Sequence, residues 1–144
     1  MKQLKIGNVT LPNRYILGPM AGVTDLPFRV LCKEQGAGLL CMEMVSAKAI
    51  SFHNKNTEAL MEIEPGERPV SLQLFGSDPD IISEMAKKIE NRPFSILDIN
   101  MGMSGIDEKE TLLKVMEDVS MQTSLPLCID SSHVDVQEYV LRHY

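Results

Sequence analysis

The sequence contains no tryptophan, and aromatic residues make up only 5% of its 144 positions. Its hydrophobic content of 44% suffices for one modest core, because a chain of this length buries one hydrophobic core and not two. No stretch approaches the roughly 20 consecutive apolar residues of a membrane-spanning helix, and the N-terminus lacks the apolar run of a signal peptide. We therefore expect a single soluble, cytoplasmic domain with no membrane partner.

Cysteine and positive charge are also scarce. Cys32, Cys41 and Cys128 lie far apart and form no C-x-x-C pair, so the sequence predicts neither a disulfide framework nor a metal site. The 14 Lys and Arg residues are outnumbered by 20 Asp and Glu residues, which gives a formal net charge of -6. Because phosphate neutralisation dominates nucleic-acid affinity, this composition argues against an autonomous nucleic-acid binder.

Short apolar runs alternate along the chain with segments of helical periodicity. Apolar runs that end in Gly or Pro are typical of strands buried on both faces of a parallel sheet. The predicted strands span residues 15–22, 39–45, 70–75, 94–99 and 125–129. The predicted helices span residues 24–36, 77–89, 108–120 and 134–141, the first with an apolar stripe at Phe28, Val30, Leu31 and Cys32.

This order of elements indicates an α/β protein with about five βα units. Two architectures remain open, a doubly wound open sheet and a partial (β/α)8 TIM barrel that is not closed. Neither G-x-G-x-x-G nor G-x-x-x-x-G-K-[ST] occurs, so the open sheet has no functional support. Residues 46–69 show no strong period and are predicted to form a long polar loop over a site, with disorder at residues 54–57 as the alternative.

Four strings of the sequence resemble, in the right order, the strand ends of tRNA-dihydrouridine synthases. They are the residues 18–29 (GPMAGVTDLPFR), 41–47 (CMEMVSA), 71–76 (SLQLFG) and 98–102 (DINMG). The resemblance covers about residues 1–102 and implies a TIM barrel with FMN at the C-terminal face of its strands. It also implies an oxidoreductase that uses NADPH to reduce FMN and passes a hydride to a flipped tRNA uridine, so that FMN and tRNA would be its cofactor and partner.

The same resemblance assigns roles to individual positions. Pro19, Met20 and Ala21 would lie against the flavin ring, Gln73 would hydrogen-bond its polar edge, and Asn100 would face the uracil. From the residues alone, Met20 is equally well explained as a gap-filling side chain at a strand end. A buried amide such as Gln73 can also be a structural group whose hydrogen bonds are satisfied within the protein.

Met103 departs from the synthase pattern. The family has at this position the cysteine that protonates the uracil, and a thioether has no proton to give. The loops that commonly hold a phosphate after barrel strands 7 and 8 do not occur in the sequence, which predicts weakened FMN binding. We therefore expect a truncated or chimeric fragment that folds incompletely and has no catalytic residue of its own.

A second resemblance covers about residues 95–144, which are similar to the pterin-binding domain of cobalamin-dependent methionine synthase. It implies that Asp98, Asn100 and Asp130 contact a pterin, whose paired N–H donors suit a carboxylate. The alternative is that Asp130, Ser131 and Ser132 form an ordinary N-cap for the last helix. The expected organisation is one incomplete domain, with residues 1–102 forming four synthase-like βα units and residues 103–144 a methyltransferase-like segment.

Three further hypotheses remain open for the function. The chain could be a pterin- or methyltetrahydrofolate-binding fragment, a flavin-binding module without chemistry, or a module that completes a partner's barrel. An unclosed parallel sheet leaves two strand edges exposed, and exposed edges favour association with other chains. The sequence therefore predicts possible self-association through these edges.

Overall fold

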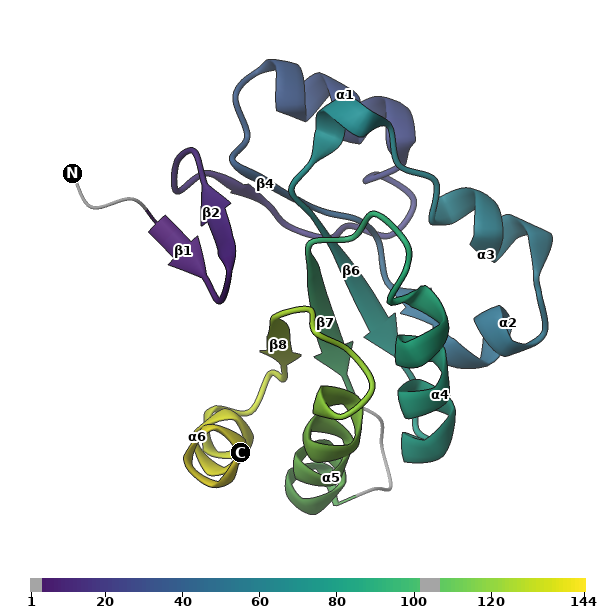
Figure 1. Cartoon of the computed structure of the whole chain (residues 1–144), viewed down its shortest axis with the longest axis vertical. Coiled ribbons are helices and arrows are strands. Elements are labelled where there is room, and N and C mark those ends of the chain that lie inside the picture. The colour runs from purple at the N-terminus through teal and green to yellow at the C-terminus, as the bar shows by residue number, and fades with distance from the viewer. Residues whose placement is uncertain (1–3, 102–106) are drawn as a thin grey trace.

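A computed structural model of the chain describes residues 4–101 and 107–144. Its main feature is a curled parallel sheet that does not close, in the strand order β3-β4-β6-β7-β8, with β5 pairing alongside β6 (Figure 1). The bounds of these strands are Ile16–Leu17 for β3, Leu39–Cys41 for β4, Val45–Ser46 for β5, Val70–Phe75 for β6, Ile96–Asn100 for β7 and Leu127–Asp130 for β8. The prediction of a partial TIM barrel is confirmed. The alternative of an open doubly wound sheet does not describe this curled sheet.

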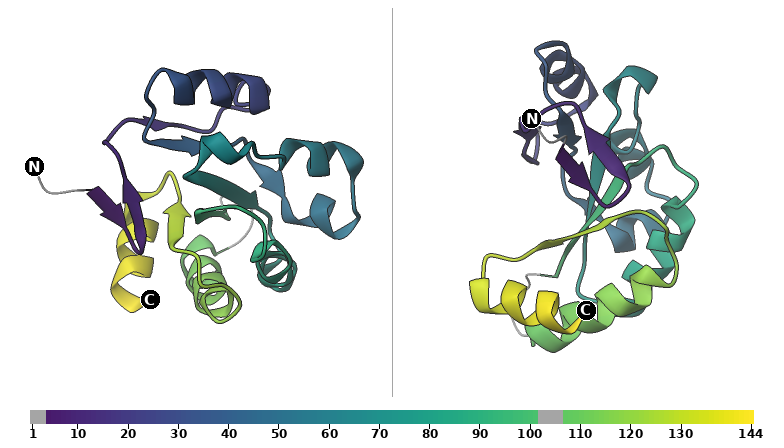
Figure 2. Two further views of the ribbon diagram at one scale, coloured as in Figure 1. Left: turned by 45° about the horizontal axis from the view of Figure 1, so that its top comes forward. Right: turned by 60° about the vertical axis from the view of Figure 1, so that its left-hand side comes forward.

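The helices lie outside the curled sheet. Their bounds are Leu26–Glu34 for α1, Ala47–Ser51 for α2, Lys55–Leu60 for α3, Pro79–Ile89 for α4, Glu108–Ser120 for α5 and Val134–His143 for α6, with a 3-10 helix η1 at Pro65–Glu67. Figure 2 shows α4, α5 and α6 side by side along one face, and neighbouring members of this series pack against each other. None of the helices in the described ranges is long and apolar enough to cross a membrane.

The main hydrophobic core lies between the sheet and these helices. Side chains alternate along a strand, so every second residue of β6 and β7 points toward α4 and α5. Strand residues Leu72, Leu74, Leu97 and Ile99 are fully buried there, and they share a cluster with helix residues that include Ile82, Met85, Leu112 and Val115. This burial fixes which residues are left for the opposite face of the sheet.

An N-terminal hairpin that sequence analysis did not predict covers part of that opposite face. Strands β1 (Leu4–Ile6) and β2 (Val9–Leu11) pair antiparallel. Leu11 forms a second, smaller buried cluster with Leu39 and Ile96, the first residues of β4 and β7. The hairpin therefore closes the N-terminal end of the sheet's inner face with apolar side chains, and the C-terminal end is left to polar ones.

Three sequence predictions about local structure are wrong. Residues 46–69 are not a long irregular loop, because they contain α2, α3 and η1, and Asn54 caps α3 by accepting from two backbone N–H groups. These helices are too short to show a helical period in the sequence. The first strand is limited to Ile16–Leu17 instead of 15–22, and the predicted apolar stripe of α1 leaves Leu31 exposed and buries Arg29 instead.

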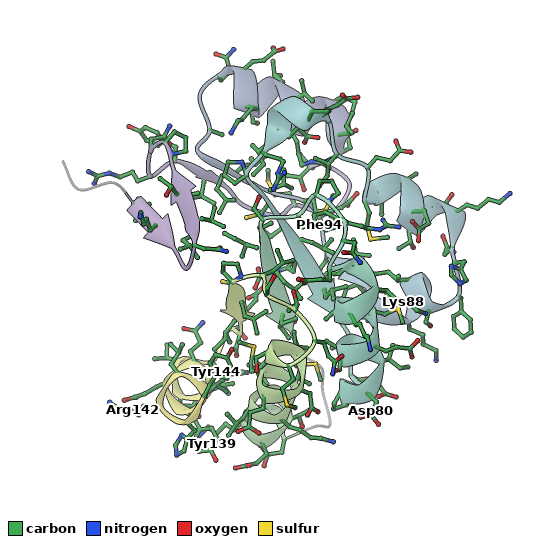
Figure 3. The ribbon with its side chains drawn as sticks, viewed as in Figure 1. Asp80, Lys88, Phe94, Tyr139, Arg142 and Tyr144 are labelled. Carbon is green, nitrogen blue, oxygen red and sulfur yellow. The ribbon has the colours of Figure 1, made fainter. Side chains whose placement is uncertain are left out.

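The sheet has two edge strands within the described part of the chain. At the β3 edge, Tyr15 and Ile16 are exposed beside a surface cavity of about 380 Å³ that runs under α1. At the β8 edge, Leu141 and Tyr144 of the C-terminal end are exposed beside a cavity of about 270 Å³. Figure 3 shows Tyr139, Arg142 and Tyr144 around α6, at this second edge.

Candidate functional site

The inner face of the sheet, which is the face turned away from α4, α5 and α6, carries polar residues near the C-terminal ends of its strands. Gln73 on β6 lies in register with Asp98 on β7, and Asn100 on β7 lies in register with Asp130 on β8. Leu72, Leu74, Leu97 and Ile99 point toward the helices, so the residues between them point inward. Strand alternation and parallel register together gather these four polar side chains at one place.

A hydrogen-bonded polar cluster, consisting of Gln73, Asp98, Asn100 and Asp130, results from this arrangement. Nε2 of Gln73 donates to Oδ2 of Asp98 at 3.2 Å and also to Oδ2 of Asp130. Nδ2 of Asn100 donates to the same Asp130 oxygen at 3.0 Å. Gln73 is only 3% exposed, so its amide is a buried group that uses both N–H donors on carboxylates.

The surroundings of Asp98 shift the pKa of its carboxyl group. Burial raises the pKa of Asp98, the nearby charge of Asp130 raises it further, and the hydrogen bond from Gln73 opposes both effects. The second oxygen, Oδ1 of Asp98, is buried and receives no N–H or O–H donor from the described residues. A buried oxygen in this state is a group that a bound donor or a proton would stabilise.

Two thiols lie next to this carboxyl group. Burial raises the pKa of Cys41 to about 12, with smaller contributions from the charge of Asp98 and from Cys128. Cys128 is exposed at the sheet surface, but partial desolvation of its sulfur, then the charge of Asp98 and a hydrogen bond to Asp98, raise the pKa of this thiol to about 11. Both thiols are therefore protonated at neutral pH, and neither has the thiolate character of a nucleophilic cysteine.

The loop of residues 18–24, hereafter the 18–24 loop, follows β3 at the same end of the sheet. Its turn is fixed by Thr24, whose Oγ1 accepts from Met20 N at 3.1 Å and donates to Met20 O at 3.1 Å. The backbone N–H groups of Val23 and Thr24 also donate to Met20 O, each at 3.0 Å. Gly22 N donates to Oε2 of Glu43 at 2.7 Å, which ties the loop to the end of β4.

The tip of this loop faces open space. Pro19, Met20 and Ala21 are all exposed, with Met20 at 42%. A Cβ atom added at Gly18 would meet no atom within 4 Å, and Gly18 does not adopt a positive φ. The chain's own packing and backbone thus do not require glycine at this position. An exposed thioether beside a free backbone surface fits the face of a planar aromatic ring, so the residues present fit the flavin that sequence analysis implies.

Comparison with known proteins identifies the family of the chain. The model of the dihydrouridine synthase (Dus) family matches residues 16–103. The chain belongs to the dihydrouridine synthase family. It is 46% identical over 103 residues to tRNA-dihydrouridine synthase B of Pseudomonas aeruginosa, which covers 71% of this chain and 31% of that protein. Its identity to probable tRNA-dihydrouridine synthase 1 of Synechocystis is 43% over 102 residues, 70% of this chain and 28% of that protein.

A third relative is the probable tRNA-dihydrouridine synthase of Rickettsia prowazekii, 41% identical over 102 residues, 69% of this chain and 31% of that protein. The chain thus spans less than a third of the length of these dihydrouridine synthases. The residues matched by the family model include the 18–24 loop and three members of the polar cluster, Gln73, Asp98 and Asn100. Asp130 lies beyond the matched residues, but it is part of the cluster because its carboxylate accepts hydrogen bonds from Gln73 and Asn100.

The structure brings together two sets of predicted site residues. Gln73 and Asn100, predicted from the dihydrouridine synthase resemblance, are hydrogen-bonded to Asp130, which was predicted only from the pterin resemblance. The alternative that residues 130–132 form the N-cap of the last helix is wrong, because the N-cap of α6 is His133, which has no side-chain capping hydrogen bond, and among the described residues the hydroxyl of Ser131 accepts only from His133 N at 3.1 Å. Met103, predicted to replace the family's acid, lies outside the described residues.

Sequence analysis missed one buried pair that bears on the site. Arg29 on α1 and Glu67 at the end of η1 are both 1% exposed and form an ion pair of 2.8 Å between Nε and Oε1. A charged residue inside a predicted apolar stripe was the available signal, because buried charges require a partner. No group of three or more His, Cys, Asp or Glu side chains in the described ranges is arranged to hold a metal ion.

Proposed function

We propose that the chain supplies the flavin-facing strands of an FMN-dependent tRNA-dihydrouridine synthase. The observation that carries this proposal is the open surface of the 18–24 loop beside Gly18, in a chain that belongs to the dihydrouridine synthase family. When bound, FMN reduced by NADPH supplies the hydride that converts uridine to dihydrouridine. In this proposal residues 1–102 form the synthase-like unit, and tRNA is the substrate.

Each predicted residue takes a role that its surroundings support. Pro19, Met20 and Ala21 contact the ring of FMN through exposed backbone and thioether groups. The amide nitrogen of Gln73 is held by two carboxylates, so its carbonyl oxygen is the group left to accept from a flavin N–H. Asn100 faces the uracil from the end of β7. Residue Met103 provides no proton, so we propose that the chain binds FMN but forms no dihydrouridine.

The test is a titration of FMN with the purified chain, followed by flavin fluorescence and by the thermal melt of the protein. Saturable quenching together with a melting temperature that rises with FMN concentration supports the proposal. A flat fluorescence signal and an unmoved melt would overturn it. Incubation with FMN, NADPH and unmodified tRNA should produce no dihydrouridine above background, and clear turnover would contradict the role assigned to Met103.

A second candidate is pterin binding, which the buried Oδ1 of Asp98 favours. Asp98 and Asp130 present carboxylate oxygens side by side, and the paired N–H donors of a pterin ring suit such an acceptor. This reading takes residues 103–144 as a methyltransferase-like segment, with Asn100 as the third contact. Thermal stabilisation by methyltetrahydrofolate that Asp130→Asn abolishes would support it, and no stabilisation at millimolar concentration would reject it.

The two sheet edges support a proposal of self-association. Exposed Tyr15 and Ile16 at the β3 edge and exposed Leu141 and Tyr144 near the β8 edge are apolar surface beside unpaired strands. Sedimentation velocity at several protein concentrations tests it. A weight-average mass that stays at 16.1 kDa across the series would reject self-association.

A further inference from the structure

The ion pair between Arg29 and Glu67 is part of a larger buried network. Nη1 of Arg29 donates to the backbone carbonyl of Thr24 at 2.9 Å, and Nη2 donates to the carbonyl of Glu62 at 2.7 Å. Oε2 of Glu67 accepts from the backbone N–H of Glu64 at 2.7 Å. Both charges therefore have a partner and additional hydrogen bonds, which is the condition under which a buried ion pair is tolerated.

Thr24 connects this network to the 18–24 loop. It is fully buried, and its carbonyl is held by Arg29 while its hydroxyl both accepts from and donates to the backbone of Met20. The next residue, Asp25, caps α1 by accepting from Phe28 N. A continuous series of hydrogen bonds thus runs from the guanidinium through one threonine to the residue at the tip of the loop.

We propose that Arg29 is a positioning residue that fixes the conformation of the 18–24 loop through Thr24 and thereby sets the orientation of Met20. The part of this inference that concerns the flavin rests on the proposed function, whereas the control of the loop does not. Arg29 is only 1% exposed, and its three guanidinium nitrogens all donate to groups of the protein, so it acts through the backbone that it holds and not through contact with a ligand.

The geometry requires arginine and not only a positive charge. The three nitrogens of the guanidinium donate to three separate segments, namely Glu67 on η1, Thr24 before α1 and Glu62 after α3. A lysine ammonium is a single nitrogen on a flexible stem and lacks the planar fork that reaches such divergent acceptors. Arg29→Lys keeps the charge for Glu67 and is expected to release the carbonyl of Thr24.

Amide hydrogen exchange of the full chain, read residue by residue, tests the positioning role. We expect Arg29→Lys and Thr24→Val each to accelerate exchange at Met20, Val23 and Thr24 by about tenfold, because each removes one step of the series. Thr24→Ser keeps the hydroxyl and should exchange like the wild type. The double variant should show no more acceleration than either single one, since both act on the same series.

A matched control separates positioning from general stability. Leu112→Ala removes a buried side chain of α5, in the core on the helix side of the sheet, and should lower global stability without accelerating exchange at those three amides relative to the rest of the chain. The proposal is overturned if Leu112→Ala accelerates them as strongly as Arg29→Lys. It is also overturned if both Arg29→Lys and Thr24→Val leave them unchanged.

FMN titration of the same variants separates this inference from the proposed function. We expect the Kd for FMN to rise about tenfold in Arg29→Lys and to stay unchanged in Arg92→Lys, whose partner Glu58 lies on α3 in a partly exposed pair. Accelerated loop exchange in a chain that never binds FMN would leave the positioning role standing and reject the proposed function. Tight FMN binding by Arg29→Lys, together with amide exchange in the loop that is unchanged from the wild type, would reject the positioning role and leave the proposed function standing.

Discussion

Gln73 and Asp98 face each other across β6 and β7, and the amide nitrogen of Gln73 donates to Oδ2 of Asp98 at 3.2 Å. The same nitrogen donates to Asp130 on β8, so one buried amide joins two carboxylates from two neighbouring strands. Two like charges close together disfavour the ionised form of each other, and an amide has no charge with which to compensate them. In the chain without ligand, repulsion between these two carboxylates on the inner face therefore lowers the stability of the fold.

The first prediction concerns stability and pH. Burial and the charge of Asp130 raise the pKa of Asp98, so the folded chain binds this proton more tightly than the unfolded chain does. Stability should therefore fall as the pH rises from the ordinary pKa of 3.8 through the raised folded value. Asp98→Asn should raise the melting temperature at pH 7 by a few degrees and flatten this dependence, measured in melts between pH 4 and pH 8.

Asp118→Asn is the control for that experiment. Asp118 also carries a carboxylate, but it lies on α5, on the helix side of the sheet. Its replacement removes one negative charge from the chain without touching the polar cluster. An equal rise in melting temperature for both variants would mean that net charge, and not the buried pair, sets the effect.

The second prediction concerns the reactivity of Cys128. Cys128 is exposed to solvent, and the pKa of its thiol is raised to about 11, first by partial desolvation of the sulfur and then by the charge of Asp98, so the thiolate is scarce at pH 8. Asp98→Asn removes the charge and should lower the pKa of Cys128, which increases the thiolate fraction and the rate of alkylation several-fold. Peptide-resolved iodoacetamide labelling between pH 7 and pH 10 measures the rate. An unchanged pH profile at Cys128 would contradict the assigned cause.

The third prediction compares two ion pairs by their burial. Glu67→Gln leaves the guanidinium of Arg29 buried without its counter-charge, and we expect it to lower the free energy of unfolding by about 3 kcal/mol. Glu84→Gln breaks the exposed pair with Lys88 and should cost less than about 1 kcal/mol. Urea denaturation gives both values. Equal losses of unfolding free energy in the two variants would show that burial does not make the loss of the counter-charge more costly.

The fourth prediction concerns two glycines of the 18–24 loop. An added Cβ at Gly18 meets no protein atom within 4 Å, so Gly18→Ala should leave stability almost unchanged while it weakens FMN binding. Gly22 has a φ of 72°, and Gly22→Ala should cost about 1 kcal/mol of stability because an alanine is strained there. Melts with and without FMN measure both effects. FMN binding by Gly18→Ala at the wild-type Kd would remove this glycine from the proposed site.

The sequence predicts the repeating βα order well, because strands such as β6 and helices such as α4 and α5 are long enough to show their periods. It also predicts which residues gather at the strand ends, since the C-terminal ends of parallel strands meet at one edge of a sheet. In the structure the side chains of Gln73, Asp98, Asn100 and Asp130 are hydrogen-bonded together at this edge, whereas the roles predicted for them stay predictions.

Other features depend on contacts between distant residues and leave no local period. The pairing of Arg29 with Glu67 joins α1 to a segment that sequence analysis interpreted as an irregular loop. The N-terminal hairpin is marked only by two strands of three residues around Gly7. Its place under the sheet is decided by the burial of Leu11 against Leu39 and Ile96, which no local pattern encodes.

The contact of that hairpin with the segment before β8 has a consequence for the order of folding. A Cβ atom on Gly7 would lie 2.7 Å from Cγ of Pro126, so the turn of the hairpin touches a residue from near the other end of the chain. Closing so long a loop of chain costs entropy before the contact repays it. We therefore expect the hairpin to dock late, after β4, β6 and β7 have assembled, so that the base of the inner face is the last part of the molecule to exclude water.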